Sequence, residues 1–420
     1  MSARKLKAPR GTFDVLGEQA RARESIEGCA KELLERAGYE RIETPVLEDT
    51  ELFLLGVGES TDIVRKEMFT LQDGGGRSLT LRPEGTAPVC RAYVEHGMHK
   101  RRQPVKLWYL SSFFRHERAQ AGRYRQFWQV GAETLGSDDP AVDAEAILIL
   151  NTLLSRLGVK STTLRLSSLG SGDARAAYRE RLQGYLREHE DELSPDVRSR
   201  IELNPLRAFD SKDPSTRHAM RNAPRLLDQL GAGDAEHFAQ VRALLDEADV
   251  SYEIDATLVR GLDYYTRTVF EFTSDELGAQ SGVAGGGRYD GLVQRLGGPP
   301  TPGMGWAAGV ERILLAGEAA PDARGGPQLF LALADGERAS RRRSAFLLLA
   351  EALSAGLRAE MELSDRSLKG QLGHAAALGA HFVAIVDSDE AVLRDMHQGS
   401  QRRLQSDAVV ETVLSALRGA

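Results

Sequence analysis

The chain has 420 residues, of which 41% are hydrophobic and 27% are charged, and its formal net charge is −7 at pH 7. This composition is ordinary for a globular protein of roughly two or three domains, and it argues against a generic nucleic-acid coat. No apolar run approaches the roughly 18 residues of a membrane span. The first residues do not lead into the apolar core of a signal peptide.

The two cysteines, Cys29 and Cys90, lack the spacing of a disulfide framework or a zinc site. We therefore expect a cytoplasmic protein with no membrane segment and no metal site of its own. Two basic runs, Lys100–Arg102 and Arg338 with Arg341–Arg343, are candidate RNA contacts, because local patches bind even on an acidic protein. Either run taken alone is more typical of a solvated surface.

The first third of the chain alternates helices with antiparallel strands. Apolar spacing predicts a helix over 18–37 that ends at Gly38, and then a strand over 39–47 broken at Pro45. Strands are predicted over 77–82, 106–114 and 126–134, with a hairpin turn at Gly74–Gly76 and helices over 85–97 and 140–157. The segment 106–134 is therefore expected to be a strand, a long loop and a second strand.

From about 171 to 248 the sequence becomes highly charged and helical, with turn signals at Asn204-Pro205, Asp213-Pro214 and Ala223-Pro224. Strands follow over 252–254 and 268–273, glycine-rich loops at 285–287 and 297–300, and a helix over 305–316. This order lacks a regular βαβ alternation. It predicts an α+β domain with an antiparallel sheet over residues 1–325, carrying a helical insertion at about 171–248.

A Pro- and Gly-rich linker is predicted over 318–327. Beyond it, strands over 328–334, 358–362 and 381–386 alternate with helices over 337–355 and 367–378. This alternation predicts a C-terminal α/β domain with a largely parallel sheet over residues 326–420.

Arginine, carboxylate and aromatic residues alternate in two distant stretches, Phe114–Glu133 and Leu258–Arg267. Guanidinium groups match phosphate oxygens two at a time, and flat rings can stack on a purine. One such stretch alone is better explained as a salt-bridged strand surface. Two of them, with further Arg- and Gly-containing motifs, favour an enzyme that uses a nucleotide.

Within these stretches, individual side chains suit the parts of ATP. We assign Arg115 to the α-phosphate, Glu117 to the adenine amino group and Phe127 to stacking on the ring, with Arg123 in the same site. Arg312 follows a glycine-rich approach and is assigned to a phosphate, although a helix-surface ion pair is an equal alternative.

Glu84 and Thr86 end a strand and suit the α-amino group of an amino acid, although Thr86 also fits a helix cap. The glycines at 285–287 permit a close approach of backbone to ligand, although such a triplet is more often a turn.

Taken together, these segments resemble the class II aminoacyl-tRNA synthetases. The region around Pro45, the segment Phe114–Phe127 and the glycine-rich segment ending at Arg312 follow the order of that family's three motifs. The segments Leu258–Tyr265 and Gly285–Leu292 are similar to two histidine-specific signatures of the histidyl-tRNA synthetase family. Arg10-Gly11-Thr12-x-Asp14 and Asn204–Arg207 also fit that family, and the resemblance covers nearly the whole chain.

The resemblance implies a role for each matching residue. Glu84, Thr86 and Gln129 would bind the backbone end of histidine, and Glu133 and Tyr265 would each bond one ring nitrogen. Such a site strongly rejects side chains that lack either nitrogen. The pocket would be completed by Tyr264 and Tyr289. Arg260, together with Arg115, would be catalytic and would contact the α-phosphate and the histidine carboxylate, while Mg²⁺ would accompany the β- and γ-phosphates.

The function implied is that of a homodimeric histidine–tRNA ligase, which would form histidyl-adenylate from L-histidine and ATP and transfer the histidyl group to tRNA(His). The alternative is a regulatory subunit of ATP phosphoribosyltransferase. Such subunits usually lack the C-terminal domain and lose ATP-site residues, whereas this chain keeps both. A further alternative is a different adenylate-forming ligase that uses the same fold on another amino acid or a carrier protein, against which Tyr264, Tyr265 and Glu133 argue.

Some positions depart from the family pattern. Ala119 stands where proline is usual, and Trp128 stands where histidine is common. The segment 387–395 is shorter than usual, and a C-terminal domain that no longer reads an anticodon is the alternative that this shortening leaves open.

Overall fold

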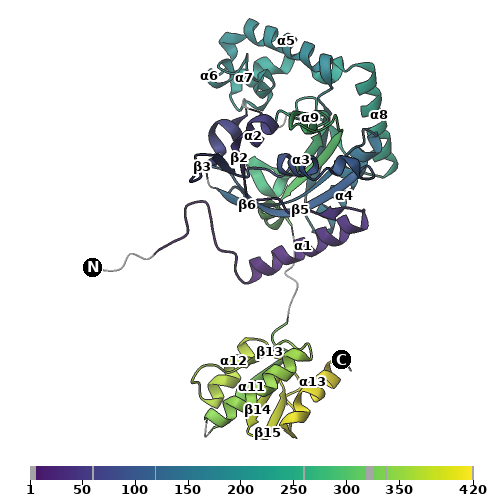
Figure 1. Cartoon of the computed structure of the whole chain (residues 1–420). Helices are drawn as coiled ribbons and strands as arrows, with labels where there is room; N and C mark the ends of the chain where they lie inside the picture. The colour runs from purple at the N-terminus through teal and green to yellow at the C-terminus, as the bar shows by residue number, and fades with distance from the viewer. Residues whose placement is uncertain are drawn as a thin grey trace, which may run out of the picture. The chain divides into compact units, whose positions relative to one another are not determined.

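The computed structural model describes residues 6–58, 61–118, 120–258, 261–317, 325–335 and 338–418. The chain divides into two compact units, Met1–Pro321 and Asp322–Ala420 (Figure 1). The division falls inside the predicted linker, most of which lies outside the described residues.

The first unit is built on an eight-stranded sheet. Its neighbouring strands are antiparallel except for the two end pairs, β1 with β5 and β7 with β8. The predicted α+β fold with an antiparallel sheet is therefore confirmed. In spatial order the strands are β1 (Glu40–Arg41), β5 (Val105–Phe114), β6 (Gln126–Leu135), β11 (Gly303–Gly309), β10 (Gly282–Arg288), β9 (Thr266–Ser274), β7 (Thr162–Ser168) and β8 (Glu253–Ile254).

One face of this sheet is covered by α1 (Glu18–Arg36), α4 (Pro140–Arg156), α8 (Ala232–Glu247) and α10 (Val310–Ala316). Apolar residues four apart, Ile26, Ala30 and Leu34, bury the inner side of α1, as the sequence spacing predicts. The start of α4 is fixed by Asp139, whose carboxylate accepts a hydrogen bond from the Ala141 N–H at 2.8 Å. This face forms the larger hydrophobic core.

The opposite face carries a second core rich in aromatic residues. It is covered by α3 (Thr86–Glu95), α9 (Leu292–Arg295) and α5 (Gly172–Glu188). Side chains of β5 alternate between the two cores, with Trp108 in the first and Tyr109 in the second. Beside this face lie α2 (Thr50–Val57), a π-helical turn (Ile63–Glu67) and a small sheet of β2 (Leu47–Asp49), β4 (Ser78–Leu81) and β3 (Phe69–Gln72).

The segment 171–248 is helical, as predicted. It contains α5, α6 (Pro195–Arg198), α7 (Pro214–Ala219) and short 3-10 turns, including Pro205–Asp210. Its last helix, α8, packs against α4 and buries Phe238, Val241 and Leu245 in the first core. The end of the insertion therefore forms part of the core of the first unit itself.

Several local predictions were wrong. The predicted loop at 285–287 lies in the middle of β10, where Gly286 faces the Gly305 carbonyl so closely that a Cβ would collide with it. Residues 305–309 belong to β11 and not to a helix, so Arg312 is the third residue of a short α10. The predicted strand at 39–47 is split into β1 and β2, and Arg82 donates to the Thr44 carbonyl between them.

The second unit has a five-stranded sheet. Its order is β13 (Ala359–Met361), β12 (Leu329–Leu333), β14 (Phe382–Asp387), β15 (Glu390–Asp395) and β16 (Gln401–Gln405). The first three strands are parallel, as predicted, and the last two are antiparallel. The helices are α11 (Arg338–Ser354), α12 (Leu368–Ala377) and α13 (Val409–Arg418).

The short segment after Val386 is a tight hairpin between β14 and β15, with Ser388 at φ 57° in its turn. Across all the residues that the structure describes, we find no helix with the length and apolar character needed to span a membrane.

Candidate active site

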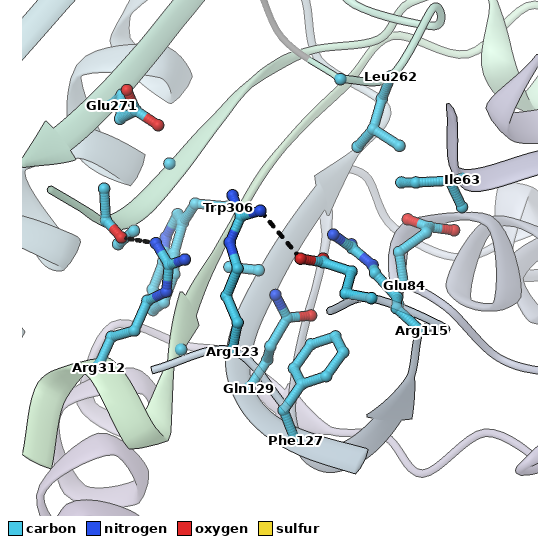
Figure 2. Close-up of a pocket in the computed structure, with 18 of the residues that line it drawn as sticks. Ile63, Glu84, Arg115, Arg123, Phe127, Gln129, Leu262, Glu271, Trp306 and Arg312 are labelled. Carbon is cyan, nitrogen blue, oxygen red and sulfur yellow. Dashed lines mark hydrogen bonds and ion pairs between the residues drawn. The ribbon is translucent and has the colours of Figure 1, made fainter. Parts of the chain in front are cut away.

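A cavity of about 540 Å³ opens on the α3 face of the large sheet. Side chains from β6, from α10 and from the loop between β5 and β6 project into it (Figure 2). The structure brings most of the predicted site residues together in its wall: Glu84, Thr86, Arg115, Glu117, Arg123, Phe127, Gln129, Tyr264, Tyr265 and Arg312. Glu133 and Tyr289 are buried: Glu133 accepts the Thr86 hydroxyl, and Tyr289 donates to Glu133. Arg260 lies outside the described residues.

A connected set of buried hydroxyl and carboxyl groups forms the base of one end of the cavity. The Thr86 hydroxyl donates to Glu133 Oε1 at 2.8 Å, and the Tyr289 hydroxyl donates to Glu133 Oε2 at 2.6 Å. The Tyr109 hydroxyl also donates to Glu133 Oε1, at 3.3 Å. We call these four residues the Glu133 network. The sequence pattern did not single out Tyr109, because nothing in its local sequence distinguishes it from an ordinary core residue of β5.

The carboxyl group at the centre of this network has an unusual proton affinity. Burial raises the pKa of Glu133 to about 8, and the hydrogen bonds from Tyr289 and Thr86 oppose that rise. At neutral pH the carboxyl group is therefore mainly protonated before a ligand arrives. An N–H donor brought close to it would favour the ionised form.

A second carboxyl group, Glu84, ends the strand–loop segment that precedes α3. Its oxygens accept the backbone N–H groups of Thr86 and Ala87, each at 2.9 Å, and the Tyr264 hydroxyl at 3.2 Å. Burial raises the pKa of Glu84, and these donors oppose the rise. Glu84, and not Thr86, therefore satisfies the first amides of α3, so the alternative role of Thr86 as the helix cap is wrong.

The other end of the cavity is dominated by arginines of the loop between β5 and β6. Arg115 Nε donates to the Pro83 carbonyl at 2.9 Å, and its guanidinium carbon lies 5.4 Å from the centre of the Phe127 ring. Arg123 Nη1 lies 3.0 Å from Glu117 Oε2 (Figure 2). The predicted phosphate, adenine and stacking residues therefore share one wall, and an entering nucleotide would compete with the Arg123–Glu117 pair.

Arg312 enters the cavity from α10. Its Nε donates to the Gly122 carbonyl at 3.1 Å, and its Nη1 donates to the Gly282 carbonyl. Burial lowers the pKa of Arg312, and Arg123 and Arg115 also lower it through like-charge repulsion. Three guanidinium groups thus face the same space, which favours an anionic ligand between them. The alternative of a helix-surface ion pair does not fit these carbonyl contacts.

The far wall comes from the helical insertion, to which the sequence assigned no site residue. Arg207 lines the cavity, with Nη1 2.8 Å from Asp210 Oδ2 and Nη2 3.8 Å from Asp62 Oδ2. Asn204 Nδ2 donates to Asp263 Oδ1 at 3.1 Å. The family signature at 204–207 was the sequence signal that could have identified Arg207 as a site residue. Its first residue, Asn204, contacts Asp263 in the segment that follows Arg260.

In the portion of the chain that is described, no group of three or more His, Cys, Asp or Glu side chains is arranged to bind a metal ion.

Comparison with known proteins places the chain in a family. A family model described as histidyl-tRNA synthetase matches residues 11–313, and one described as anticodon binding domain matches residues 342–416. The histidine–tRNA ligase of Desulforudis audaxviator is 47% identical to the chain over 421 residues, covering 98% of the chain and 99% of the relative.

Solved structures agree with this comparison. The structure of apo S. aureus histidyl-tRNA synthetase superposes with a TM-score of 0.81 at 34% identity, covering 97% of this chain and 100% of that one. A Bacillus halodurans C structure, titled as an ATP phosphoribosyltransferase regulatory subunit/histidyl-tRNA synthetase, shares the fold at a TM-score of 0.63 and 24% identity, covering 88% and 96%. On the full-length match and the family model, the chain belongs to the histidyl-tRNA synthetase family.

Proposed function

We propose that the chain is a histidine–tRNA ligase that activates L-histidine with ATP and transfers the histidyl group to tRNA(His). The observation that carries this proposal is the division of the cavity. One end is a buried network of hydroxyl and carboxyl groups, and the other end presents arginines beside an aromatic ring. Family membership supports the same reaction.

In this proposal, the buried end recognises histidine. Glu84, which already accepts the Tyr264 hydroxyl, would take the α-amino group, with help from Thr86 and Gln129. The imidazole would lie between Glu133 and Tyr265, where each ring nitrogen meets one partner. Because Glu133 is mainly protonated in the empty site, we expect it to ionise or to rotate its proton when an imidazole N–H approaches.

The arginine end would then hold ATP. A histidine carboxylate oxygen attacks the α-phosphorus, the bond to the pyrophosphate oxygen breaks, and histidyl-adenylate and pyrophosphate result. Arg115 and Arg260 would stabilise the charge that develops at the α-phosphate, and Arg312 and Arg123 would hold the remaining phosphates. Phe127 would stack on adenine and Glu117 would accept its amino group.

Magnesium enters this scheme with ATP as part of the substrate. It would be held by oxygens of the β- and γ-phosphates, in keeping with a cavity that offers no carboxylate cage among the described residues.

In the second half-reaction, a ribose hydroxyl of the terminal adenosine of the tRNA attacks the histidyl carbonyl carbon. AMP leaves, and its phosphate can accept the hydroxyl proton. The anticodon-binding model matches within the C-terminal unit, which would hold the distal end of the tRNA. The reaction would take place in the cytoplasm. A homodimer would cover the apolar side chains exposed beside the small sheet, Val46, Leu47 and Leu71.

The test is histidine-dependent exchange of pyrophosphate into ATP without tRNA, followed by charging of total tRNA with histidine. The ligase should show both activities. Absence of exchange in a folded protein would instead favour the regulatory subunit, since such a subunit needs no adenylate chemistry.

The RNA-binding role of the C-terminal unit has its own test. A chain ending near Ala320 should retain the exchange but charge tRNA poorly. Full charging by this shortened chain would show that the C-terminal unit does not read the tRNA.

A further inference from the structure

A tight turn near the start of the chain contacts the ATP-site loop from outside the cavity. The Pro9 carbonyl accepts the Thr12 N–H at 3.1 Å and the Thr12 hydroxyl at 2.8 Å, and Gly11 has φ 85°. This conformation presents the Gly11 carbonyl to the Arg125 N–H at 2.8 Å. A Cβ on Gly11 would lie 2.7 Å from Cγ of Arg125, so both the turn and the contact require glycine.

Aromatic and charged contacts extend this attachment. The Phe13 ring centre lies 4.7 Å from that of Tyr124. The guanidinium of Arg23, in α1, lies 5.6 Å from the Phe13 ring centre and 4.2 Å from the Trp128 ring centre. Figure 1 draws the segment before α1 as a chain that bends toward the β6 end of the sheet. Residues 9–13 therefore lie against the outer side of the loop and of β6.

The same outer surface also reaches α10. Arg23 Nη2 lies 2.6 Å from Glu311 Oε1, and Glu311 Oε2 accepts the Trp128 N–H at 3.1 Å. Burial raises the pKa of Glu311, and the Trp128 N–H and Arg23 oppose that rise. Glu311 precedes Arg312, and Trp128 lies between Phe127 and Gln129. Glu311 thus also lines the cavity itself, and Trp128 is one residue away from two side chains that line it.

The loop is closed on itself at its base and near its tip. Arg115 N–H donates to the Arg125 carbonyl at 3.0 Å, and Gln120 and Arg123 exchange backbone hydrogen bonds at 2.9 and 3.0 Å. Fixing Arg125 from outside therefore fixes the strand of the loop that pairs with Arg115. Among the described residues that line the cavity, none comes from the turn at 9–13.

We propose that residues 9–13, together with Arg23, form a brace that holds the ATP-binding loop in its binding conformation before ATP arrives. Gly11, Phe13 and Arg23 are positioning residues, because they act through Arg125, Tyr124 and Trp128. The inference rests on the proposed function, since the loop is taken to bind ATP. A loop that is already ordered loses less conformational entropy when it closes on a ligand, so the brace lowers the KM for ATP more than it raises kcat.

The first experiment compares two truncations on either side of the turn. Removing residues 2–8 leaves the turn intact, and Leu6 within that segment is 90% exposed. Removing residues 2–14 deletes the turn and Phe13. In ATP–pyrophosphate exchange, the longer truncation should raise the KM for ATP about tenfold, with a much smaller change in the KM for histidine. Equal ATP KM values for the two truncations would overturn the proposal.

Point variants separate positioning from general stability. Gly11→Ala should raise the ATP KM, whereas Gly17→Ala should not, although Gly17 also has a positive φ of 54° and its Cβ would meet nothing within 4 Å. Phe13→Tyr should keep the ring contact and near-normal ATP KM, and Phe13→Ala should not. A parallel loss in Gly11→Ala and Gly17→Ala would indicate backbone destabilisation and would contradict the brace.

A measurement without activity distinguishes failure of the brace from failure of the proposed function. Hydrogen–deuterium exchange of residues 115–126 should speed up in Gly11→Ala and in the longer truncation, while exchange of α4 stays unchanged. Unchanged exchange of the loop would overturn the brace even if the wild-type enzyme activates histidine. If the variants show faster hydrogen–deuterium exchange of the loop but the wild type lacks ATP–pyrophosphate exchange, the brace is supported and only the ligand assigned to the loop is contradicted.

Discussion

The two ends of the cavity are held together in different ways. At the buried end, Glu133 is fully inaccessible to solvent, and its oxygens accept the hydroxyls of Thr86, Tyr109 and Tyr289. At the arginine end, the Arg123 side chain is 43% exposed and is paired with Glu117, while Arg115 and Arg312 donate to backbone carbonyls. The hydrogen bonds of the buried end are thus already formed before its ligand arrives. At the arginine end, the guanidinium groups must give up contacts within the protein before they can bind a phosphate.

Because of this difference, we expect the buried end to select the amino acid and the arginine end to stabilise the charge of the phosphates. A buried network pays a high cost when one partner is missing, so it discriminates sharply between ligands. The partly exposed Arg123–Glu117 pair contributes less to stability, because water screens it, and its guanidinium is free to turn to a phosphate during the reaction. Substitutions at the buried end should therefore change the use of histidine, and substitutions at the arginine end should change the use of ATP.

The largest effect is expected for Arg115→Ala. Loss of the guanidinium that the proposal places at the α-phosphate should lower the rate of adenylate formation by about 10²–10³-fold. Single-turnover formation of histidyl-adenylate measures this rate. Arg118→Ala is the matched control, because Arg118 is exposed in the same loop; a comparable loss in both variants would show that the effect is not specific to the cavity.

Glu133→Gln should lower kcat/KM for histidine by about 10–100-fold while leaving the KM for ATP within a few-fold of its original value, because a buried hydrogen bond left unmade costs about 1–3 kcal/mol. Steady-state exchange with each substrate varied in turn separates the two effects. Glu32→Gln, on the outer side of α1, is the control. A larger rise in the ATP KM than in the histidine KM would contradict the separation of the two ends.

The pH dependence of stability should also originate at the buried end. The pKa of Glu133 is raised from 4.5 to about 8 by burial, so the folded chain binds this proton more tightly than the unfolded chain does. The resulting stabilisation is complete below pH 4.5 and is lost as the pH rises through about 8, at about 1.4 kcal/mol for each unit of difference. Urea unfolding from pH 5 to 9 should show a flatter profile for Glu133→Gln than for the wild type. Identical pH profiles of stability for the two proteins would show that Glu133 is not the group that binds this proton.

The smallest effect is expected for Arg123→Ala. Its pair with Glu117 is partly exposed, so loss of the pair should change the free energy of unfolding by less than about 1 kcal/mol. Because the freed Glu117 no longer has to be released by ATP, the KM for ATP should change only a few-fold. ATP–pyrophosphate exchange with ATP varied and urea unfolding measure the two quantities. A single-turnover rate of adenylate formation as low as that of Arg115→Ala would make Arg123 a catalytic residue.

The sequence predicted which residues gather around the cavity better than it predicted which of them bond to one another. Arg115, Glu117 and Phe127 lie where their strand–loop–strand pattern placed them, because the register of two adjacent strands is a local property. The link from Glu133 to Tyr289 joins residues 156 positions apart, so it depends on the order of β6, β11 and β10 in the sheet. No local pattern contains that order.

The errors at 285–287 and 305–309 have a related cause. Both segments consist largely of small residues, which local propensity assigns to loops or helices. They are strands because β10 and β11 lie side by side, where larger side chains would push the backbones apart. Arg207 was missed because its position also depends on distant parts of the chain. It reaches the cavity wall only through the way in which the whole insertion folds back.

The Glu133 network has an evolutionary consequence. Thr86, Tyr109 and Tyr289 come from three separate segments, yet each donates to the same carboxyl group. Loss of the Tyr289 hydroxyl removes the donor to Glu133 Oε2, and loss of Thr86 or Tyr109 leaves Oε1 with one of its two donors. In each case a second mutation elsewhere in the group would be needed to restore the balance. We therefore expect these positions to change together or not at all among homologues. The preference for one amino-acid substrate should then change more slowly in evolution than the residues of the protein surface or of the ATP loop.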